Sequence, residues 1–390
     1  MSTADRHLRI VEPRPIPFDG CDRQAKCEAT KKDRNMKRVW LIATTVALLG
    51  MGPGAVDAAV IGVVAPTSGS FALLGAQVLA GARAAAEITG DTLIEINEDC
   101  DAEDASDVAN QLLAAKAVAS FGFLCSETLT TALPQLKAAG IPAITLSVRS
   151  AILMEDALRD DLPFFRLGPA EGDEAERISE VILDRWKAEP IALIDDGTIY
   201  GRELVSAVRG TIEGAGLAPV FVDTFRPGQE QQVALIRRLK KAGATHVLIG
   251  GDRTDVSIIA RDAAAENLSL KIMGGDTMRA TDRPVPLREG VMAVALPNYL
   301  ALPEASETVE TLRSRLIEPE GYVLPSYAAV QLISEASRAA PPLGHALQSL
   351  RFQTVIGPLS FGEDHELSEN PLRLQEWRNG AFLPAVVPTE

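Results

Sequence analysis

The feature that most constrains the fold is a regular alternation of apolar runs and helical stretches along residues 59–273. The first run, residues 59–65, is continuously apolar, which is typical of a strand buried on both faces of a sheet. The stretch after it has helical spacing, with Leu74, Val78 and Ala82 on one face. The same pattern predicts strands over 59–65, 92–96, 118–124, 143–146, 191–194, 220–225, 246–250 and 270–273, and helices over 71–88, 105–117, 128–139, 173–187, 200–214, 231–242 and 256–265.

Successive strand–helix units predict parallel sheets with right-handed crossovers. A second series of units begins near Pro169, so the fold class is α/β with two doubly wound, Rossmann-like lobes. Two domains also agree with the length of residues 59–390, which exceeds the size at which single cores stop growing. The pattern alone does not assign the elements after Gly290 to a lobe.

Residues 36–58 have the pattern of a signal peptide. Met36-Lys37-Arg38 is a basic start, and the strongly apolar stretch that follows, residues 39–51, is too short to span a bilayer. Val56-Asp57-Ala58 offers small residues at positions −3 and −1, which predicts cleavage before Ala59 and export to the periplasm. An uncleaved membrane anchor is the alternative. No cysteine stands at the cleavage point, which argues against a lipoprotein.

Residues 1–35 fit neither a signal peptide nor a domain, and we interpret them as a possible start-site artefact. They carry Cys21 and Cys27, so only Cys100 and Cys125 remain after cleavage. Two cysteines in an exported protein predict one disulfide, which on the chain-entropy model would stabilise the fold by about 3–4 kcal/mol. Two unpaired buried thiols are the alternative.

Charge and motifs exclude several functional classes. The chain has 38 basic and 53 acidic residues, of which residues 1–58 hold 10 and 7, leaving a net charge of −18 for residues 59–390. Such an acidic protein is not expected to bind nucleic acid or anionic lipid. The sequence has no dinucleotide-binding glycine motif, Walker loop, nucleophile elbow or zinc-protease motif. We therefore predict no enzyme, no catalytic residue, no cofactor and no metal.

In doubly wound sheets, ligands bind beyond the carboxyl ends of the strands, so the residues that follow each strand are the candidates. In the first lobe these are Ser126, at a helix N-terminus that favours an anion, and Ser147 and Arg149 after the fourth strand. In the second lobe Tyr200, Asp252 and Asp276 follow strands. Plain helix capping by Ser126, Asp252 or Asp276 and first-turn packing of Tyr200 are the alternatives.

Several motifs in chain order resemble the leucine/isoleucine/valine-binding proteins, the branched-chain amino-acid class of type I periplasmic solute-binding proteins. The resemblance runs across residues 59–390 and rests on the cysteine spacing together with other short motifs. These are Ile61-Gly62-Val63-Val64-Ala65-Pro66-Thr67-Ser68-Gly69 through Gly75 and Gly81, Leu124-Cys125-Ser126, Gly140-Ile141-Pro142, Tyr200-Gly201, Gly274, Ser326-Tyr327-Ala328-Ala329, and Val355-Ile356-Gly357-Pro358-Leu359-Ser360-Phe361.

The resemblance implies three hinge crossovers between the lobes, near Leu167–Gly168, Leu296–Pro297 and Phe352–Val355. The N-terminal lobe is then expected to comprise residues 59–168 plus 297–352. The C-terminal lobe is expected to comprise residues 169–296 plus 353–390.

The resemblance also implies roles for individual residues. Ser126 corresponds to the serine that binds the ligand's α-carboxylate, and Ser147 to a position whose backbone carbonyl meets the α-ammonium. Asp276 corresponds to the acidic residue that binds this ammonium. Arg149 occupies a position usually held by threonine, which bonds the amino-acid head group. Tyr200 and Tyr327 correspond to aromatic residues of the cleft.

Three departures leave the ligand open. Leu74 and Asp252 stand where the family often has cleft aromatics. Arg149 could bind a second carboxylate of an acidic ligand, pair with Asp276 or Asp252 and replace the ammonium site, or point outward. Branched-chain specificity is therefore not fixed by the sequence.

We expect a monomeric receptor that closes on a small amino-acid-like ligand and docks on the permease subunits of an ABC importer. The importer partners are implied by the resemblance only. A periplasmic sensor feeding a signalling receptor, or a binder of a non-amino-acid carboxylate or amide, are the alternatives.

Overall fold

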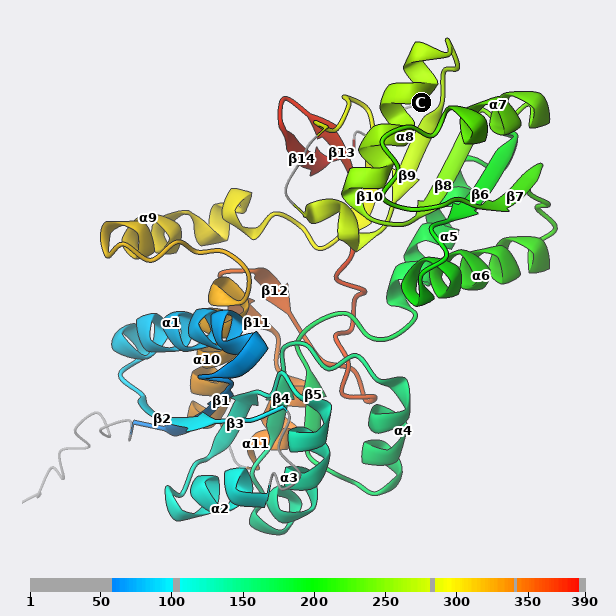
Figure 1. The fold of residues 1–390 in the computed structure, drawn as a ribbon. Helices are drawn as coiled ribbons and strands as arrows, with labels where there is room; N and C mark the ends of the chain where they lie inside the picture. Colours follow the sequence, from blue (N-terminus) through cyan, green and yellow to red (C-terminus); the bar gives the residue numbers. More distant parts are fainter. Residues whose placement is uncertain (1–57, 101–105, 281–284, 340–341, 386–390) are drawn as a thin grey trace, which may run out of the picture. The chain divides into compact units, whose positions relative to one another are not determined.

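The computed structural model describes residues 58–100, 106–280, 285–339 and 342–385 (Figure 1). The predicted signal peptide and the segment before it lie outside these ranges, apart from Ala58. Of the four cysteines in the sequence, Cys100 and Cys125 fall within the described residues.

The first lobe is built on a parallel sheet of five strands in the order β2-β1-β3-β4-β5. Its strands are β1 (Val60–Ala65), β2 (Thr92–Asn97), β3 (Ala119–Gly122), β4 (Ala143–Thr145) and β5 (Phe164–Arg166). The connecting helices are η1 (Gly69–Phe71), α1 (Ala72–Thr89), α2 (Ser106–Ala114), α3 (Ser126–Ala139) and α4 (Ala151–Arg159). The predicted strands and helices of this lobe are confirmed, with shifted ends, and α4 and β5 are additional elements.

Side chains of β1 alternate between the two faces of this sheet, as a buried strand requires. Ile61, Val63 and Ala65 belong to the core on one face, whereas Val64 belongs to the core on the other, with α2, α3 and α4. Each buried Val or Ile contributes about 1.5–3 kcal/mol relative to an exposed side chain. Helices therefore cover both faces of the sheet.

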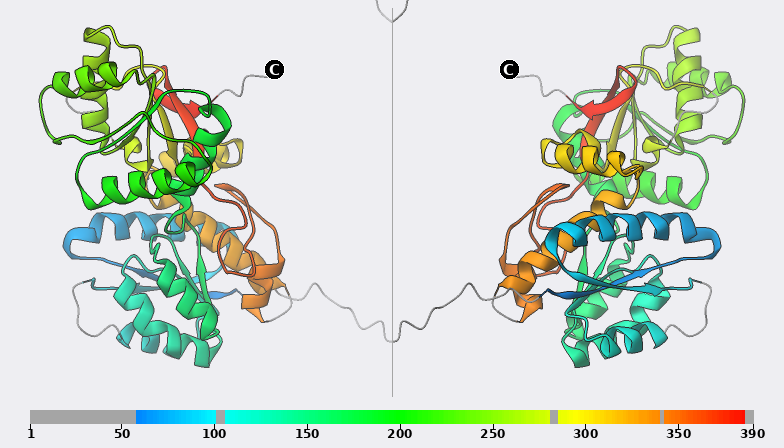
Figure 2. Two further views of the ribbon diagram at one scale, coloured as in Figure 1. Left: turned by 90° about the vertical axis from the view of Figure 1, so that its right-hand side faces the viewer. Right: turned by 90° about the vertical axis from the view of Figure 1, so that its left-hand side faces the viewer.

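The chain returns to the first sheet after building the second one. η3 (Tyr299–Ala301), η4 (Pro303–Ala305), α9 (Ser306–Ser314), α10 (Val323–Arg338) and α11 (Leu343–Ser349) follow the last parallel strand of the second sheet. α10 lies along α1 in both orientations of the ribbon (Figures 1 and 2). Gly81 of α1 permits this approach, because a Cβ there would lie 2.0 Å from the carbonyl oxygen of Val323.

The segment Gly69–Thr89 is long and apolar enough to cross a membrane by length and composition alone. In the structure, Val78, Ala82 and Ala85 of this segment are fully buried in the core that α10 shares. We therefore assign α1 as a core helix of the lobe.

The second lobe is built on seven strands in the order β14-β13-β10-β9-β8-β6-β7. Five are parallel: β6 (Ile191–Asp195), β7 (Phe221–Thr224), β8 (His246–Gly250), β9 (Lys271–Gly274) and β10 (Met292–Ala295). β13 (Arg373–Arg378) and β14 (Ala381–Pro384) add an antiparallel edge. The helices are α5 (Asp173–Arg185), α6 (Ile199–Gly214), α7 (Val233–Ala242), α8 (Arg253–Ala265) and η2 (Asp276–Arg279).

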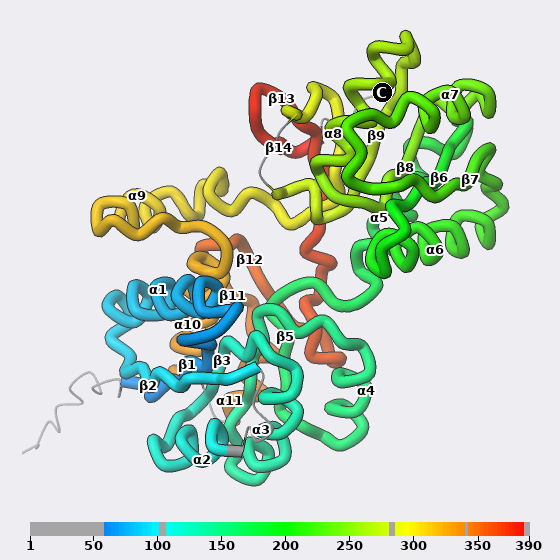
Figure 3. Tube along the Cα trace, viewed as in Figure 1, coloured from blue at the N-terminus to red at the C-terminus, as the bar shows by residue number. Residues whose placement is uncertain are grey.

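The third crossover between the lobes lies further along the chain than the expected Phe352–Val355. β11 (Phe352–Thr354) and β12 (Gly357–Leu359) form a small antiparallel hairpin. Phe352, Val355 and Phe361 belong to the core of the first sheet, and the chain joins the second sheet only at β13. The tube trace shows this path, from orange at α10 to red at β13 (Figure 3). Burial of these apolar side chains keeps the hairpin with the first lobe.

Candidate ligand-binding site

Ser126 begins α3 directly beyond β3, at the carboxyl end of the first sheet. The N-cap of α3 is Cys125, whose sulfur is bonded to that of Cys100 with a Cα–Cα distance of 5.3 Å. The predicted disulfide is therefore confirmed. The Ser126 side chain is exposed, and the first turn of a helix presents N–H groups without partners inside the helix. This turn can accordingly accept an anion.

Glu98 also fixes the turn that precedes α3. Its carboxylate accepts hydrogen bonds from the backbone N–H groups of Leu124 at 2.6 Å and Cys125 at 3.3 Å. The residue is only 1 % exposed, and this burial raises the pKa of the carboxyl to about 7, against the opposing effect of the two N–H groups. A disulfide and a buried carboxyl together fix the position of Ser126.

The raised pKa of Glu98 predicts a specific pH dependence of stability. Because the folded state holds this proton more tightly than the unfolded chain, its contribution to stability is complete below about pH 4.5 and is lost as pH rises through about 7. Ionisation at pH 8 should cost about 2–3 kcal/mol. Glu98→Gln should therefore lose less stability than the wild type between pH 5 and pH 8, measured by chemical denaturation.

Glu95 provides the control for this measurement. It lies in β2, three residues before Glu98, but its hydrogen bond with Arg83 lowers the pKa of its carboxyl. Glu95→Gln should therefore leave the pH dependence above pH 5 unchanged. If the free energies of unfolding of Glu98→Gln and the wild type changed equally between pH 5 and pH 8, the raised pKa of Glu98 would be contradicted.

The segment after β4 carries Ser147 and Arg149 toward the same turn. The Ser147 hydroxyl donates to the carbonyl of Leu124 at 3.3 Å. The Thr145 hydroxyl donates to the carbonyl of Phe123 at 2.9 Å and accepts from the N–H of Ser147 at 3.2 Å. The turns after β3 and β4 are thereby tied together. The turns that carry Ser126 and Ser147 are thus neighbours.

In the second lobe, Tyr200 and Asp276 meet at a buried carboxylate, Glu174. Oε1 of Glu174 accepts from the Tyr200 hydroxyl at 2.7 Å and from the Asp276 N–H at 2.6 Å. Burial raises the pKa of both Glu174 and Tyr200. Oδ1 of Asp276 accepts from the N–H of Leu296 at 3.1 Å, which leaves Oδ2 for other partners.

Gly275 leaves the space in which this network forms. A Cβ at this position would lie 1.9 Å from Oε1 of Glu174 and 2.5 Å from the Tyr200 hydroxyl. Any larger residue would have to displace both side chains. The network of Glu174, Tyr200 and Asp276 therefore depends on glycine at this position.

An ion pair connects the residues of the two lobes. Nη2 of Arg149 lies 3.5 Å from Oδ2 of Asp276, with side chains 44 % and 23 % exposed. Of the three possibilities left open by the sequence, the structure thus shows Arg149 paired with Asp276. At this exposure the pair contributes little stability, about 0–1 kcal/mol, so both groups remain available to a ligand.

Tyr322, the N-cap of α10, joins the same group. Burial raises the pKa of its hydroxyl, while its hydrogen bond with Ser147 and the charge of Arg149 act in the opposite direction, and Asp276 adds to the increase. The Tyr322 hydroxyl is thus bonded to Ser147 and feels the charges of Arg149 and Asp276.

Two predicted site residues have other contacts. The carboxylate of Asp252 accepts the N–H of Asp255 at 2.9 Å and is the N-cap of α8, the capping alternative noted from the sequence. Tyr327 is 7 % exposed and belongs to the core of the first lobe. No described contact joins either residue to the group around Arg149 and Asp276.

Sequence reasoning missed Glu174 and Tyr322. Glu174 lies in the first turn of α5, where acidic residues are common because they favour the helix dipole. The one available signal was its place among three acidic residues, Asp173, Glu174 and Glu176, of which only one faces inward. Tyr322 falls in the part of the chain whose pattern we did not assign.

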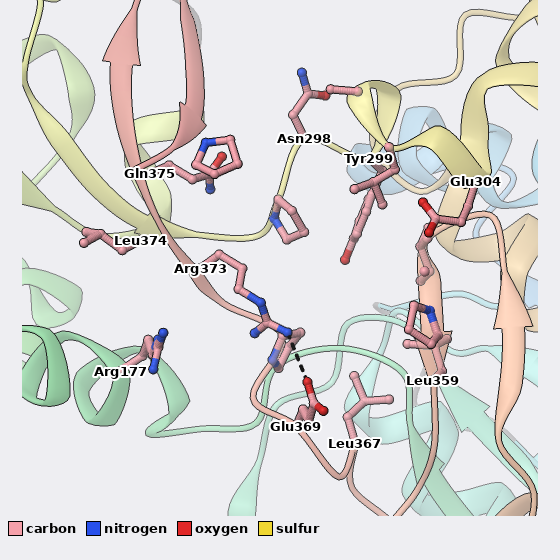
Figure 4. Close-up of a pocket in the computed structure, with 18 of the residues that line it drawn as sticks. Arg177, Asn298, Tyr299, Glu304, Leu359, Leu367, Glu369, Arg373, Leu374 and Gln375 are labelled. Carbon is pink, nitrogen blue, oxygen red and sulfur yellow. Dashed lines mark ion pairs between the residues drawn. The ribbon is translucent and has the colours of Figure 1, made fainter. Parts of the chain in front are cut away.

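A separate cavity of about 610 Å³ lies among the segments that connect the lobes, lined by Leu167, Tyr299, Leu367 and Arg373 among others (Figure 4). In the close-up, the Arg373 guanidinium points toward the carboxylate of Glu369, to which it is paired at 3.5 Å. None of the seven predicted ligand residues lines this cavity. It is therefore distinct from the group around Arg149 and Asp276.

Comparison with known proteins identifies the family. A family model described as "Periplasmic binding protein" matches residues 59–381. The chain belongs to the periplasmic binding protein family. This assignment confirms the predicted fold, with two Rossmann-like lobes joined by three crossovers. It also confirms that the protein is not an enzyme, because members of the family are the substrate-binding proteins of transporters.

Relatives of this periplasmic binding protein support the resemblance to the branched-chain class. An "Amino acid binding protein" of Pseudomonas aeruginosa is 27% identical over 88% of this chain and 97% of its own length. A "Leu/Ile/Val/Thr-binding protein" of Salmonella typhimurium is 27% identical over 90% of this chain and 100% of its own.

Solved structures show the same fold at lower identity. The branched-chain amino acid transporter substrate binding protein LivJ from Streptococcus pneumoniae, in complex with isoleucine, matches with a TM-score of 0.58 and 19% identity. That match covers 84% of this chain and 98% of the other. An ABC transporter substrate-binding protein from Sphaerobacter thermophilus matches with a TM-score of 0.63 and 21% identity, over 85% and 97% of the two chains.

Proposed function

We propose that this periplasmic binding protein is the exported receptor of an ABC importer, and that it delivers a small amino-acid-like ligand to a membrane permease. The observation that carries the proposal is the pairing of Arg149 with Asp276, which brings hydrogen-bond donors of one lobe to carboxylates of the other. The names of the relatives, which include amino-acid and Leu/Ile/Val/Thr binding, support the same ligand class.

The ligand's carboxylate is assigned to the first lobe. The first turn of α3 at Ser126 offers backbone N–H donors, and the Arg149 guanidinium offers N–H donors and positive charge. The Tyr322 hydroxyl adds a further group beside Ser147. A carboxylate bound there would satisfy these groups.

The ligand's ammonium is assigned to the second lobe. Asp276 presents Oδ2, and Glu174 lies behind it, held by the Tyr200 hydroxyl. An ammonium bound at Asp276 would compete with Arg149 for this oxygen and release the guanidinium toward the ligand's carboxylate. Closure of the lobes would then exclude water and strengthen both contacts.

One observation favours a second candidate ligand class. Because Arg149 already neutralises Asp276, a neutral amide, or a carboxylate that shares the guanidinium with Asp276, would leave no unpaired charge at Asp276. A non-amino-acid carboxylate, bound by Arg149 and the α3 turn, is therefore the second candidate for the same receptor.

A thermal-shift screen of residues 59–390, refolded to remove bound ligand, tests the proposal. The panel contains branched-chain, small, acidic and aromatic amino acids, with amides and dicarboxylates that lack an ammonium group. A ligand at about 100 times its Kd adds about 2.7 kcal/mol, which should raise Tm by several degrees. Shifts with amino acids alone support the Asp276 site. Shifts restricted to compounds without an ammonium support the second candidate, and no shift contradicts both.

Arg149→Thr should change which ligands bind. If the guanidinium contacts a ligand carboxylate, its loss should weaken binding of that ligand about 10- to 100-fold, as expected for a hydrogen bond between charged groups. Arg209→Thr is the control, since Arg209 is paired with Glu213 on the same helix and is not part of the group around Asp276. An unchanged ligand profile for Arg149→Thr would remove Arg149 from the site.

A further inference from the structure

Arg166, at the end of β5, is the largest fully buried side chain among the described residues, with 1 % of its surface exposed. Burying a guanidinium is costly unless its donors are paired. Its contacts therefore show what the fold gains from a charge at this position.

Two of the donors of Arg166 hold the backbone on either side of Arg149. Nε donates to the carbonyl of Val148 at 2.7 Å, and Nη2 donates to the carbonyl of Ser150 at 2.7 Å. The intervening carbonyl, that of Arg149, accepts the N–H of Glu171 at 2.9 Å. Three consecutive carbonyls are thus fixed, while the Arg149 side chain itself remains 44 % exposed.

A further partner of Arg166 comes from the segment that follows β12. Nη1 pairs with the carboxylate of Glu366, and the backbone N–H of Arg166 donates to the carbonyl of His365 at 3.2 Å. The His365 ring stacks on Phe165 with centroids 4.4 Å apart. The third connection between the lobes is thereby attached to the strand that supports the Arg149 segment.

Only arginine can make these contacts from one side chain. Its planar guanidinium presents donors at fixed directions, whereas the ammonium of lysine is a single point from which the Val148 and Ser150 carbonyls and Glu366 cannot all be reached in the same geometry. Arg166 acts on Arg149 only through the backbone, at the Val148 and Ser150 carbonyls. No described contact joins the two guanidinium groups.

We propose that Arg166, paired with Glu366, is the positioning residue of the ligand site. It holds the backbone on both sides of Arg149, so that the guanidinium of Arg149 is presented to Asp276 and to the ligand. Arg166 itself touches no ligand, because it is buried. This inference rests on the proposed function, and preorganisation of a binding group in this way raises affinity by reducing the cost of ordering it on binding.

A double-mutant cycle tests the inference with the ligand that gives the largest shift in the screen. Arg166→Lys should weaken binding about tenfold by calorimetry when Arg149 is present, and by less than about twofold in the Arg149→Thr background. A merely structural role would give equal losses in both backgrounds, and that result, or an unchanged affinity of Arg166→Lys, would overturn the proposal. Ile333→Val, a core change in the same lobe, is the control and should leave affinity unchanged.

Glu366→Gln keeps the test usable if Arg166→Lys does not fold. It retains an oxygen for Nη1 but removes the charge, so it should weaken binding in the same direction by a smaller factor, again only when Arg149 is present. Strengthened or unchanged binding would count against the pair.

Failure of the proposed function is distinguishable from failure of this inference. If no compound in the screen binds, the proposed function fails, and hydrogen exchange of the ligand-free protein still tests the positioning role. Arg166→Lys should then accelerate exchange at residues 147–153 and leave residues 200–205 unchanged. Unaltered exchange at residues 147–153 would overturn the inference alone.

Discussion

Replacing both cysteines by serine (Cys100→Ser with Cys125→Ser) should lower the free energy of unfolding by about 3–4 kcal/mol. The disulfide joins residues 25 positions apart, and constraining a loop of this length in the unfolded chain accounts for that amount on the chain-entropy model. For a protein of this size Tm should fall by about 4–6 °C. Denaturant unfolding and calorimetry under non-reducing conditions measure the change.

Reductant supplies the control for this prediction. It should lower the Tm of the wild type to that of the double variant and leave the variant unchanged, and the intact mass of the wild type should rise by two hydrogens. Free thiols at Cys100 and Cys125 in the unreduced protein, or equal unfolding free energies, would contradict it.

Ligand affinity should respond less than stability to loss of the disulfide. Glu98 holds the N–H groups of Leu124 and Cys125 independently of the sulfur–sulfur bond. The turn that presents Ser126 therefore keeps one of its two constraints. Loss of the disulfide should therefore reduce the stability of the fold more than it disturbs the geometry of the site.

Apart from α4 and β5, the sequence predicted the strand–helix order through residue 273, because buried parallel strands give continuous apolar runs. It missed β5, which has three residues and ends in Arg166, since a charged residue contradicts the pattern of a buried strand. Only tertiary contacts, with Val148, Ser150 and Glu366, make that burial favourable. Short strands stabilised by such contacts give no signal in periodicity.

Site residues were predictable where position along a strand determines location. Ser126, Ser147 and Asp276 follow strands, so all were predicted at the carboxyl ends of the sheets, where the structure places them. Glu174 was not predictable, because its role depends on which face of α5 turns inward. Tyr327 was assigned by resemblance, but its place on the buried face of α10 puts it in the core.

Asp276→Asn should weaken amino-acid binding by about 30-fold or more. The substitution removes the negative charge assigned to the ligand's ammonium, and breaking such a hydrogen-bonded charge pair costs about 2 kcal/mol or more. Asparagine keeps an oxygen for the Leu296 N–H, so the backbone around η2 should be retained. Calorimetric titration with the amino acid selected by the screen measures the loss.

Asp252→Asn is the matched control, because it makes the same chemical change at a residue also predicted to contact the ligand. Asp252 caps α8, and asparagine is an equally good N-cap, so the free energy of unfolding should be nearly unchanged. Ligand affinity should stay within about twofold of the wild type. An equal loss of affinity in the two variants would place the ammonium nearer Asp252, or show that net charge alone controls binding.

Asp276→Asn also separates the two ligand classes. In the wild type, Arg149 is paired with Asp276, so a ligand carboxylate must compete for the guanidinium. Asp276→Asn removes this competitor, and dicarboxylates without an ammonium should therefore bind at least as tightly as they bind the wild type. If amino acids lose affinity while dicarboxylates do not, Asp276 is the ammonium site and Arg149 the carboxylate site. If both classes lose affinity equally, Asp276 instead acts by orienting Arg149, and the assignment of the ammonium to Asp276 fails.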